Sequence, residues 1–308
     1  MFQDHSLIFI LQQMDIKSIF QSITVCRFWR ESIENYMKRP DIETNLIDCG
    51  KNMELGIKLA ERGFKVKLDM SCNHDLDYTD DLMKALGKMY DLNLSGNHEV
   101  IWDKHLPFLS GVHTLNISYC YDTITDVSVL KDVFNLDISY CNGISDISGL
   151  GEGKIHTLNI SDTPIKEVPN LPNLRHINAD YTEVDPEELK KLENLESFSC
   201  GKEYFLDDQS EKEIPDGITR VRIYENYYVS RSWDNFDQFP KSVEEIYIGI
   251  GAVSDKMEPG SIRRTISHLH RLKKISIYFF SDFDEELYDA IEYFEKNFGR
   301  NIEIEEYR

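Results

Sequence analysis

The sequence predicts an α/β solenoid, in which short parallel strands line one side and helices or turns line the other. Eleven segments between Ile47 and Ile277 each contain two apolar residues that are two positions apart. Such alternation indicates a short strand with one buried face. The segments recur about every twenty to thirty residues, an interval typical of folds whose units pack only on their neighbours.

The first residue of each apolar pair locates the predicted strand. These residues are Ile47, Leu68, Leu92, Leu115, Leu136, Leu158, Ile177, Phe198, Val221, Ile246 and Ile275. Five positions later most repeats carry Asn, Cys or Thr, which can bond to backbone left unpaired by a turn. These residues are Asn52, Asn73, Asn97, Cys120, Cys141, Thr163, Thr182 and Asn226. The pattern resembles a leucine-rich repeat and implies a horseshoe with about 11 short parallel strands on its concave side.

The segments between the strands predict a convex side that is helical near its ends and flatter in the middle. Residues Met53–Gly63 and Thr79–Lys88 read as helices, whereas 125–130 and 145–150 are too short for more than a turn or two. Three prolines at 164, 169 and 172 make the next connection extended or 3₁₀-like. After the last repeat, acids from Asp282 onward and apolar residues through Phe298 predict a helix cap. Ile302 and Ile304 suggest one more strand.

Composition and charge narrow the function. A formal net charge of -21 over 308 residues argues against nucleic acid or an anionic membrane as the partner. The sequence contains no apolar stretch of transmembrane length and no signal peptide. Its six cysteines include no CxxC pair, so we expect reduced thiols in an intracellular protein of the cytoplasm or nucleus. No constellation of nucleophile and base, cofactor or metal ligands is found, so we expect no enzyme, no cofactor and no metal.

The first forty residues do not follow the repeat. Their apolar residues recur at helical spacing in three short segments that end before Pro40. Three such helices make a small core, so their remaining apolar surface predicts a partner. The alternative is that they only close the end of the repeat stack, as terminal caps must.

Part of this segment is similar to a known motif. Residues 14–33 resemble the second half of an F-box, with Val25-Cys26-Arg27-Phe28-Trp29-Arg30 at the core of the match. The opening Leu-Pro of that family is missing, and Phe2-Gln3-Asp4 stands in its place. The resemblance implies docking on the Skp adaptor and, through it, on a cullin. It assigns the adaptor contact to Leu7, Ile10, Leu11, Met14, Ile16, Ile19, Val25, Cys26 and Trp29.

Residues that alternate with the buried pairs form the predicted concave face. Its first half is a polar row of Asn and Asp with a row of Ser beside it, which indicates solvated sheet, and Tyr119, Tyr140 and Tyr181 interrupt it at the edge. Later strands become aromatic and basic, a composition enriched at binding hot spots. We therefore predict target binding by Arg220, Arg222, Tyr224, Tyr247, Lys274 and Tyr278. The alternative is cross-strand aromatic packing.

Together these observations divide the chain into three parts. Residues 1–40 form an F-box-like helical segment, 41–281 form the leucine-rich-repeat solenoid, and 282–308 form a cap of helix and strand. The resemblance implies a substrate-recognition subunit of an SCF-type ubiquitin ligase that binds an unknown target protein and is a monomer outside that complex. The alternative is a repeat scaffold that binds proteins without a ligase.

Overall fold

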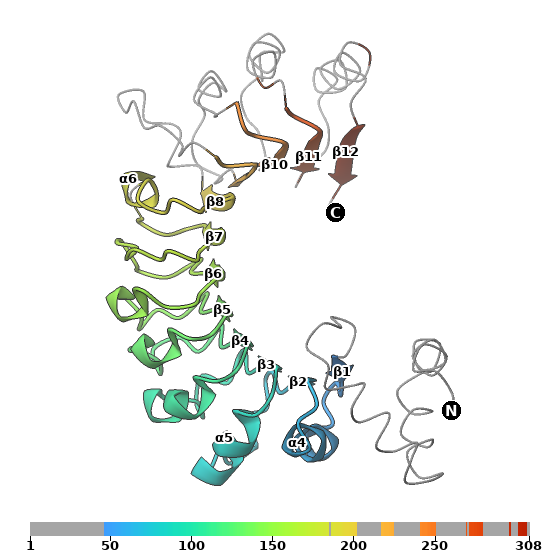
Figure 1. Ribbon diagram of the computed structural model, residues 1–308, viewed down its shortest axis with the longest axis vertical. Helices are drawn as coiled ribbons and strands as arrows, with labels where there is room; N and C mark the ends of the chain where they lie inside the picture. The colour runs from blue at the N-terminus through green and yellow to red at the C-terminus, as the bar shows by residue number, and fades with distance from the viewer. Residues whose placement is uncertain are drawn as a thin grey trace, which may run out of the picture.

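The computed structural model of the chain describes residues 46–184, 186–201, 217–224, 241–250, 269, 271–279, 296 and 301–306. Within them, one parallel sheet contains twelve strands, and each strand pairs with its neighbours in the sequence. Figure 1 shows these strands along the inner side of a curved arc, with α4 (Met53–Glu61) and α5 (Asp80–Leu86) on its outer side. The arrangement is a solenoid-like α/β repeat fold.

The strands are short in the first two thirds of the sheet and longer in the last third. They are β1 (Ile47–Asp48), β2 (Val66–Asp69), β3 (Asp91–Asn93), β4 (Thr114–Asn116), β5 (Asn135–Asp137), β6 (Thr157–Asn159), β7 (His176–Ala179), β8 (Ser197–Gly201), β9 (Arg220–Tyr224), β10 (Glu245–Ile250), β11 (Lys274–Phe279) and β12 (Asn301–Glu306). The last of them contains Ile302 and Ile304.

The predicted register holds from β2 onward. Leu68 pairs with Leu92, Leu92 with Leu115, and the first apolar residues continue to pair in this way as far as Ile275 and Ile302. The inward pairs form the core, and Leu68, Leu92 and Leu158 have no exposed surface. The apolar pairs therefore predicted which residues pair as well as which are buried.

The predicted alignment of the first repeat is wrong. Ile47 pairs with Val66 rather than with Leu68, so β1 is displaced by two residues. A displacement of two keeps the same side chains on the buried face, and Ile47 and Cys49 are both buried. Asn52 consequently leaves the predicted ladder, and its side chain accepts a hydrogen bond from the backbone N–H of Leu55 at 3.1 Å as the N-cap of α4.

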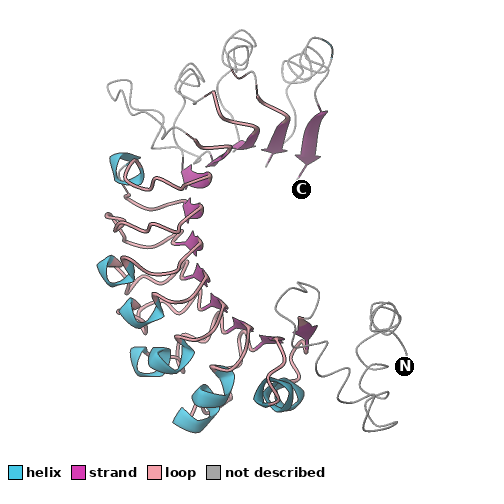
Figure 2. Ribbon diagram, in the orientation of Figure 1, coloured by secondary structure: helices cyan, strands magenta, loops and turns pink. Residues whose placement is uncertain are grey.

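Between residues 46 and 184 the outer side becomes flatter along the chain, as predicted, and its predicted helical character near the C-terminal end lies outside the described residues. The helices α4 and α5 are followed by 3₁₀ segments η2 (Asp103–Leu109), η3 (Ser128–Leu130) and η4 (Ser148–Leu150), and no helix lies between 164 and 170. Figure 2 shows this change, with helices on the outer side and strands on the inner side. A short helix, α6 (Pro186–Leu189), precedes β8. The segment η2, which contains Pro107, was not predicted.

Neighbouring repeats approach closely on the outer side. A Cβ atom added to Gly87 would lie 1.9 Å from the carbonyl oxygen of Phe108, whereas one added to Gly111 would meet nothing nearer than 4.0 Å. Gly87 therefore allows α5 and η2 to pack together.

Several predicted features lie outside the described residues. They are the helices of 1–40, with every residue assigned to the adaptor contact, Asn226, and the C-terminal helix apart from Lys296. In the part of the chain that the structure describes, no helix has the length and apolar character needed to span a bilayer.

Candidate binding surface on the concave sheet

A row of Asp and Asn side chains ends the strands of the concave sheet. Each side-chain oxygen accepts a hydrogen bond from the backbone N–H two residues later. The bonds run from Gly50 to Asp48 (2.8 Å), Ser71 to Asp69 (2.9 Å), Ser95 to Asn93 (3.0 Å), Ser118 to Asn116 (2.9 Å), Ser139 to Asp137 (3.0 Å), Ser161 to Asn159 (3.2 Å) and Asp180 to Asn178 (3.1 Å). The row therefore turns the chain out of the sheet.

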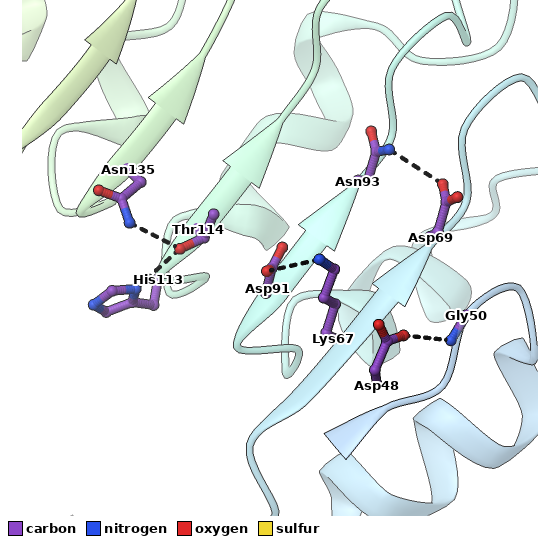
Figure 3. A network of polar contacts seen from close by, with 9 residues as sticks. All are labelled: Asp48, Gly50, Lys67, Asp69, Asp91, Asn93, His113, Thr114 and Asn135. Atoms are coloured by element: carbon purple, nitrogen blue, oxygen red, sulfur yellow. Dashed lines mark hydrogen bonds and ion pairs between the residues drawn. The ribbon is translucent and has the colours of Figure 1, made fainter. Parts of the chain in front are cut away.

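The same row is also linked from strand to strand. The amide of Asn93 donates to Asp69 at 3.2 Å, and the amide of Asn159 donates to Asp137 at 3.0 Å. Figure 3 shows the first of these bonds, beside the ion pair of Lys67 and Asp91 at 4.0 Å. The polar side chains of the Asp and Asn row are thus largely hydrogen-bonded within the fold.

The prediction that the neighbouring serine row is solvated is wrong for three of its members. Ser118, Ser139 and Ser161 are buried. The hydroxyl of Ser139 donates to Asp137 at 2.6 Å, in addition to the backbone bond. In these three repeats the serine therefore belongs to the packed turn and not to the solvated surface.

A strip of stacked rings borders the sheet where the strands begin. This strand-entry strip consists of Lys65, Tyr90, His113, Phe134, His156 and His176. The ring centroids of Tyr90 and His113 are 4.3 Å apart, those of His113 and Phe134 4.7 Å, and those of Phe134 and His156 4.6 Å, all nearly parallel. Because the rings cover one another's faces, the strip is half-buried.

The surroundings lower the pKa of two histidines of the strand-entry strip, His113 and His176. Burial lowers the pKa of His113, and the nearby Lys65 ammonium lowers it further. Burial likewise lowers the pKa of His176, with His156 as a second cause. The ring of His113 is oriented by the hydroxyl of Thr114, 3.1 Å from its Nδ1 (Figure 3).

A second group of rings lies where the strands end. This strand-exit strip consists of His74, His98, Tyr121, Tyr119 and Tyr140. Tyr119 and Tyr140 stack with centroids 4.2 Å apart, while the other contacts are edge-to-face at 5.1 to 6.5 Å. Unlike the strand-entry strip, it leaves rings open to solvent, since Tyr119 is 42% and Tyr121 41% exposed.

Tyrosines at this edge occupy a backbone conformation that favours glycine. Tyr119, Tyr121, Tyr140 and Tyr181 have φ of 57, 44, 57 and 56°. In the repeat before Tyr119 the equivalent residue is Gly96, with φ 73°. A residue other than glycine in this left-handed backbone conformation lowers the stability of the fold by about 1–2 kcal/mol. Burial and a hydrogen bond to Asp162 both raise the pKa of Tyr140, so its hydroxyl stays protonated.

Behind these turns runs a ladder of Asn and Cys side chains. Asn97 is fully buried, and Cys120 and Cys141 occupy the same position in the next two repeats. The Cys141 thiol donates to the carbonyl oxygen of Ile117 at 3.3 Å. Burial raises the pKa of both thiols to about 12. The cysteines Cys49, Cys72, Cys120 and Cys141 are all free.

The residues predicted to bind a target lie on β9, β10 and β11. Arg220 forms an ion pair with Glu245 at 3.0 Å, and the Tyr247 hydroxyl donates to the same carboxylate at 3.0 Å. The Lys274 ammonium lies 5.6 Å from the centre of the Tyr247 ring. Cross-strand contacts thus bring these three predicted residues together.

The other three predicted residues are placed by backbone register alone. Arg222 pairs with Tyr247, and Tyr224 and Tyr278 both pair with Gly249. Their side chains lie outside the described residues. In the described part of the chain, no group of three or more His, Cys, Asp or Glu residues is arranged to hold a metal ion.

The described residues define a solenoid-like α/β protein whose successive repeats each add one strand to a parallel sheet. No protein-family model matches the chain, and no curated protein matches it. Among solved structures it is similar to the functional domain of InlJ from Listeria monocytogenes, which includes a cysteine ladder. That similarity has 13% identity and a TM-score of 0.20 and covers 69% of this chain and 67% of that chain. No conclusion about function follows from it.

Proposed function

We propose that this chain is the substrate-recognition subunit of an SCF-type ubiquitin ligase. Residues 1–40 dock on the Skp adaptor and through it on a cullin, and the repeats bind a target protein. The adaptor half rests on one observation, the F-box-like core Val25–Arg30, which contains Trp29. The target half is supported by solvent-exposed tyrosines on the edge of a long parallel sheet.

Such a subunit performs no chemistry of its own. It holds the target at a fixed distance from the ligase, which raises the effective concentration of the target and orients it.

Affinity purification of the full chain tests the adaptor half. We expect the wild-type chain to recover a Skp adaptor and a cullin, and a variant with Trp29→Ala and Leu11→Asp to recover neither. If wild type recovers no adaptor, the ligase proposal fails. Recovery that survives both substitutions would refute the assigned interface.

A second function, a repeat scaffold without a ligase, is favoured by the position of β1. Within the described residues β1 pairs only with β2, so one edge of the sheet needs a cover. If residues 1–40 are only that cover, their deletion should remove hydrogen-exchange protection from β2 and β3. If they are a docking module, protection in these strands should be unchanged.

The predicted target-binding residues are tested separately. Arg222→Glu combined with Tyr247→Ala should abolish target capture while leaving the melting curve unaltered. Tyr247→Phe is the matched control, since it keeps the ring near Lys274 and removes the hydroxyl that bonds to Glu245. Unchanged capture by the double variant would exclude this surface.

A further inference from the structure

We propose that the strand-exit strip binds an extended segment of the partner protein that is rich in lysine and arginine. The proposal rests on the part of the proposed function in which the repeats bind a protein, and it is independent of the adaptor. Three properties of the strip support it: exposed aromatic rings, a backbone conformation that tyrosine does not favour, and an excess of negative charge.

The rings of the strip form a continuous path across four repeats. His74 contacts His98 at 5.1 Å, His98 contacts Tyr121 at 5.2 Å, and Tyr121 contacts Tyr119 at 6.5 Å. One face of Tyr119 is covered by Tyr140. On the other side the equivalent residue is Gly96, which has no side chain to cover the ring. Because Tyr119 remains 42% exposed, a cation can approach its ring, and the face of a tyrosine ring attracts ammonium and guanidinium groups.

The backbone at these tyrosines is evidence that their side chains serve more than the fold. Gly96 shows that the turn accepts a residue without a side chain, and Asp162 shows that it accepts a small polar one. Both suit positive φ better than tyrosine does. Side chains kept in such conformations cluster at ligand-binding sites.

Charge distinguishes this edge from the rest of the concave face. The strand-exit segments 71–77, 95–99, 118–122, 139–143, 161–165 and 180–184 contain no lysine or arginine. Their exposed acids include Asp75, Asp77, Glu99 and Asp122. Of the other acids, Asp180 is buried and accepts from the Ser199 hydroxyl, Asp162 bonds to Tyr140, and Glu183 forms an ion pair with Lys166 at 2.7 Å. By contrast, the strand-entry strip includes Lys65, and Glu245 offsets the cations of the β9–β11 surface. A basic segment therefore complements the strand-exit edge best.

The spacing of the edge fits an extended peptide. Successive repeats are adjacent strands of one sheet, so rings and carboxylates recur about every 5 Å along it. An extended chain rises about 3.3 Å per residue. Basic side chains at every second residue are about 6.6 Å apart, and the long side chains of lysine and arginine can adjust to the 5 Å recurrence. They can then alternate between ring faces and carboxylates such as Glu99 and Asp122, both of which are exposed.

The test measures binding of labelled peptides to the purified full chain by fluorescence polarisation. The probe is an arginine–serine repeat of ten residues, and its neutral counterpart carries citrulline in place of arginine. We expect the arginine peptide to bind, the citrulline peptide to bind at least about tenfold more weakly, and binding to weaken at high salt.

Two variants separate the strip from general attraction to an acidic protein. Tyr119→Gly removes an exposed ring and relieves positive φ, so it should keep the melting temperature while weakening binding about tenfold. Trp102→Ala removes an equally exposed ring outside the strip and should leave binding unchanged.

Three outcomes would overturn the proposal: no binding of the arginine peptide by wild type, equal binding by Tyr119→Gly, or equal loss with Trp102→Ala. Binding of a neutral chito-oligosaccharide at the strip in place of the peptide would also overturn it. None of these outcomes bears on adaptor recovery, so the ligase proposal can stand or fall separately.

Discussion

Replacing Asn97 by alanine should lower the free energy of unfolding by about 3–4 kcal/mol. Its side chain has no exposed surface. The amide donates to the carbonyl oxygens of Met70 (2.8 Å) and Leu94 (2.9 Å), and its oxygen accepts from the backbone N–H of Asn73 (2.8 Å). One residue therefore joins two repeats through two buried bonds and one part-buried bond.

The magnitude follows from the groups that the substitution leaves behind. A buried polar group without a partner costs about 1–3 kcal/mol. The N–H of Asn73 loses a well-formed bond, which accounts for about 2 kcal/mol, and the two carbonyl oxygens add about 1–2 kcal/mol because each still has a second lone pair.

Urea unfolding, followed by far-ultraviolet circular dichroism, measures this loss. Asn97→Cys is the matched variant, because Cys120 and Cys141 hold the same position in the next two repeats. The Asn97→Cys variant should lose about half as much free energy of unfolding as Asn97→Ala. Asn116→Ala removes a single part-buried bond and should cost about 1 kcal/mol. An Asn97→Ala loss below about 1 kcal/mol at an unchanged denaturant slope would refute the argument.

Three further outcomes follow from the described contacts. Burial raises the pKa of the Cys120 and Cys141 thiols to about 12, so the stability that they contribute is complete below the unfolded thiol pKa near 9 and is lost as pH rises toward 12. The free energy of unfolding of a Cys120→Ala/Cys141→Ala variant should therefore fall less steeply over this pH range than that of wild type. Parallel falls in the two proteins would contradict this. Because burial lowers the pKa of His113, the stability of the fold should fall as pH drops below about 6.5. Melting temperatures measured in acid should fall less steeply with pH in His113→Phe than in wild type. An equally steep fall in the variant would count against this. Gly87→Ala should cost at least about 1–3 kcal/mol, whereas Gly111→Ala should be tolerated; equal stabilities would show that the outer side can adjust.

The repeat was readable because the same physical demand recurs in every unit. Each strand must bury two side chains on one face, so the pairs beginning with Leu92, Leu115 and Leu136 predicted both the core and the register. The pairing of the first repeat was predicted wrongly because a shift of two residues keeps the same face of the strand buried. Pattern alone does not distinguish Leu68 from Val66 as the partner of Ile47.

The two aromatic strips were harder to predict. In the strand-entry strip the side chains are Tyr, His and Phe in turn, so no single residue type repeats; the usable signal is a ring two residues before the apolar pair, as at Tyr90, His113 and Phe134. In the strand-exit strip the deciding feature is positive φ, which sequence reasoning assigns to glycine and not to Tyr119 or Tyr140.

A partner would therefore meet two kinds of polar surface on the concave sheet. In the middle, the oxygens of residues such as Asn93 and Asn116 already hold the backbone of the turn, so a partner that competes for them must break bonds of the fold. At the strand-exit edge, the exposed ring of Tyr121 and the carboxylate of Asp122 can be bound without such a loss. Binding affinity is the interaction energy that is left after such losses are subtracted. The strand-exit edge therefore suits recognition better than the middle of the sheet, which supports it.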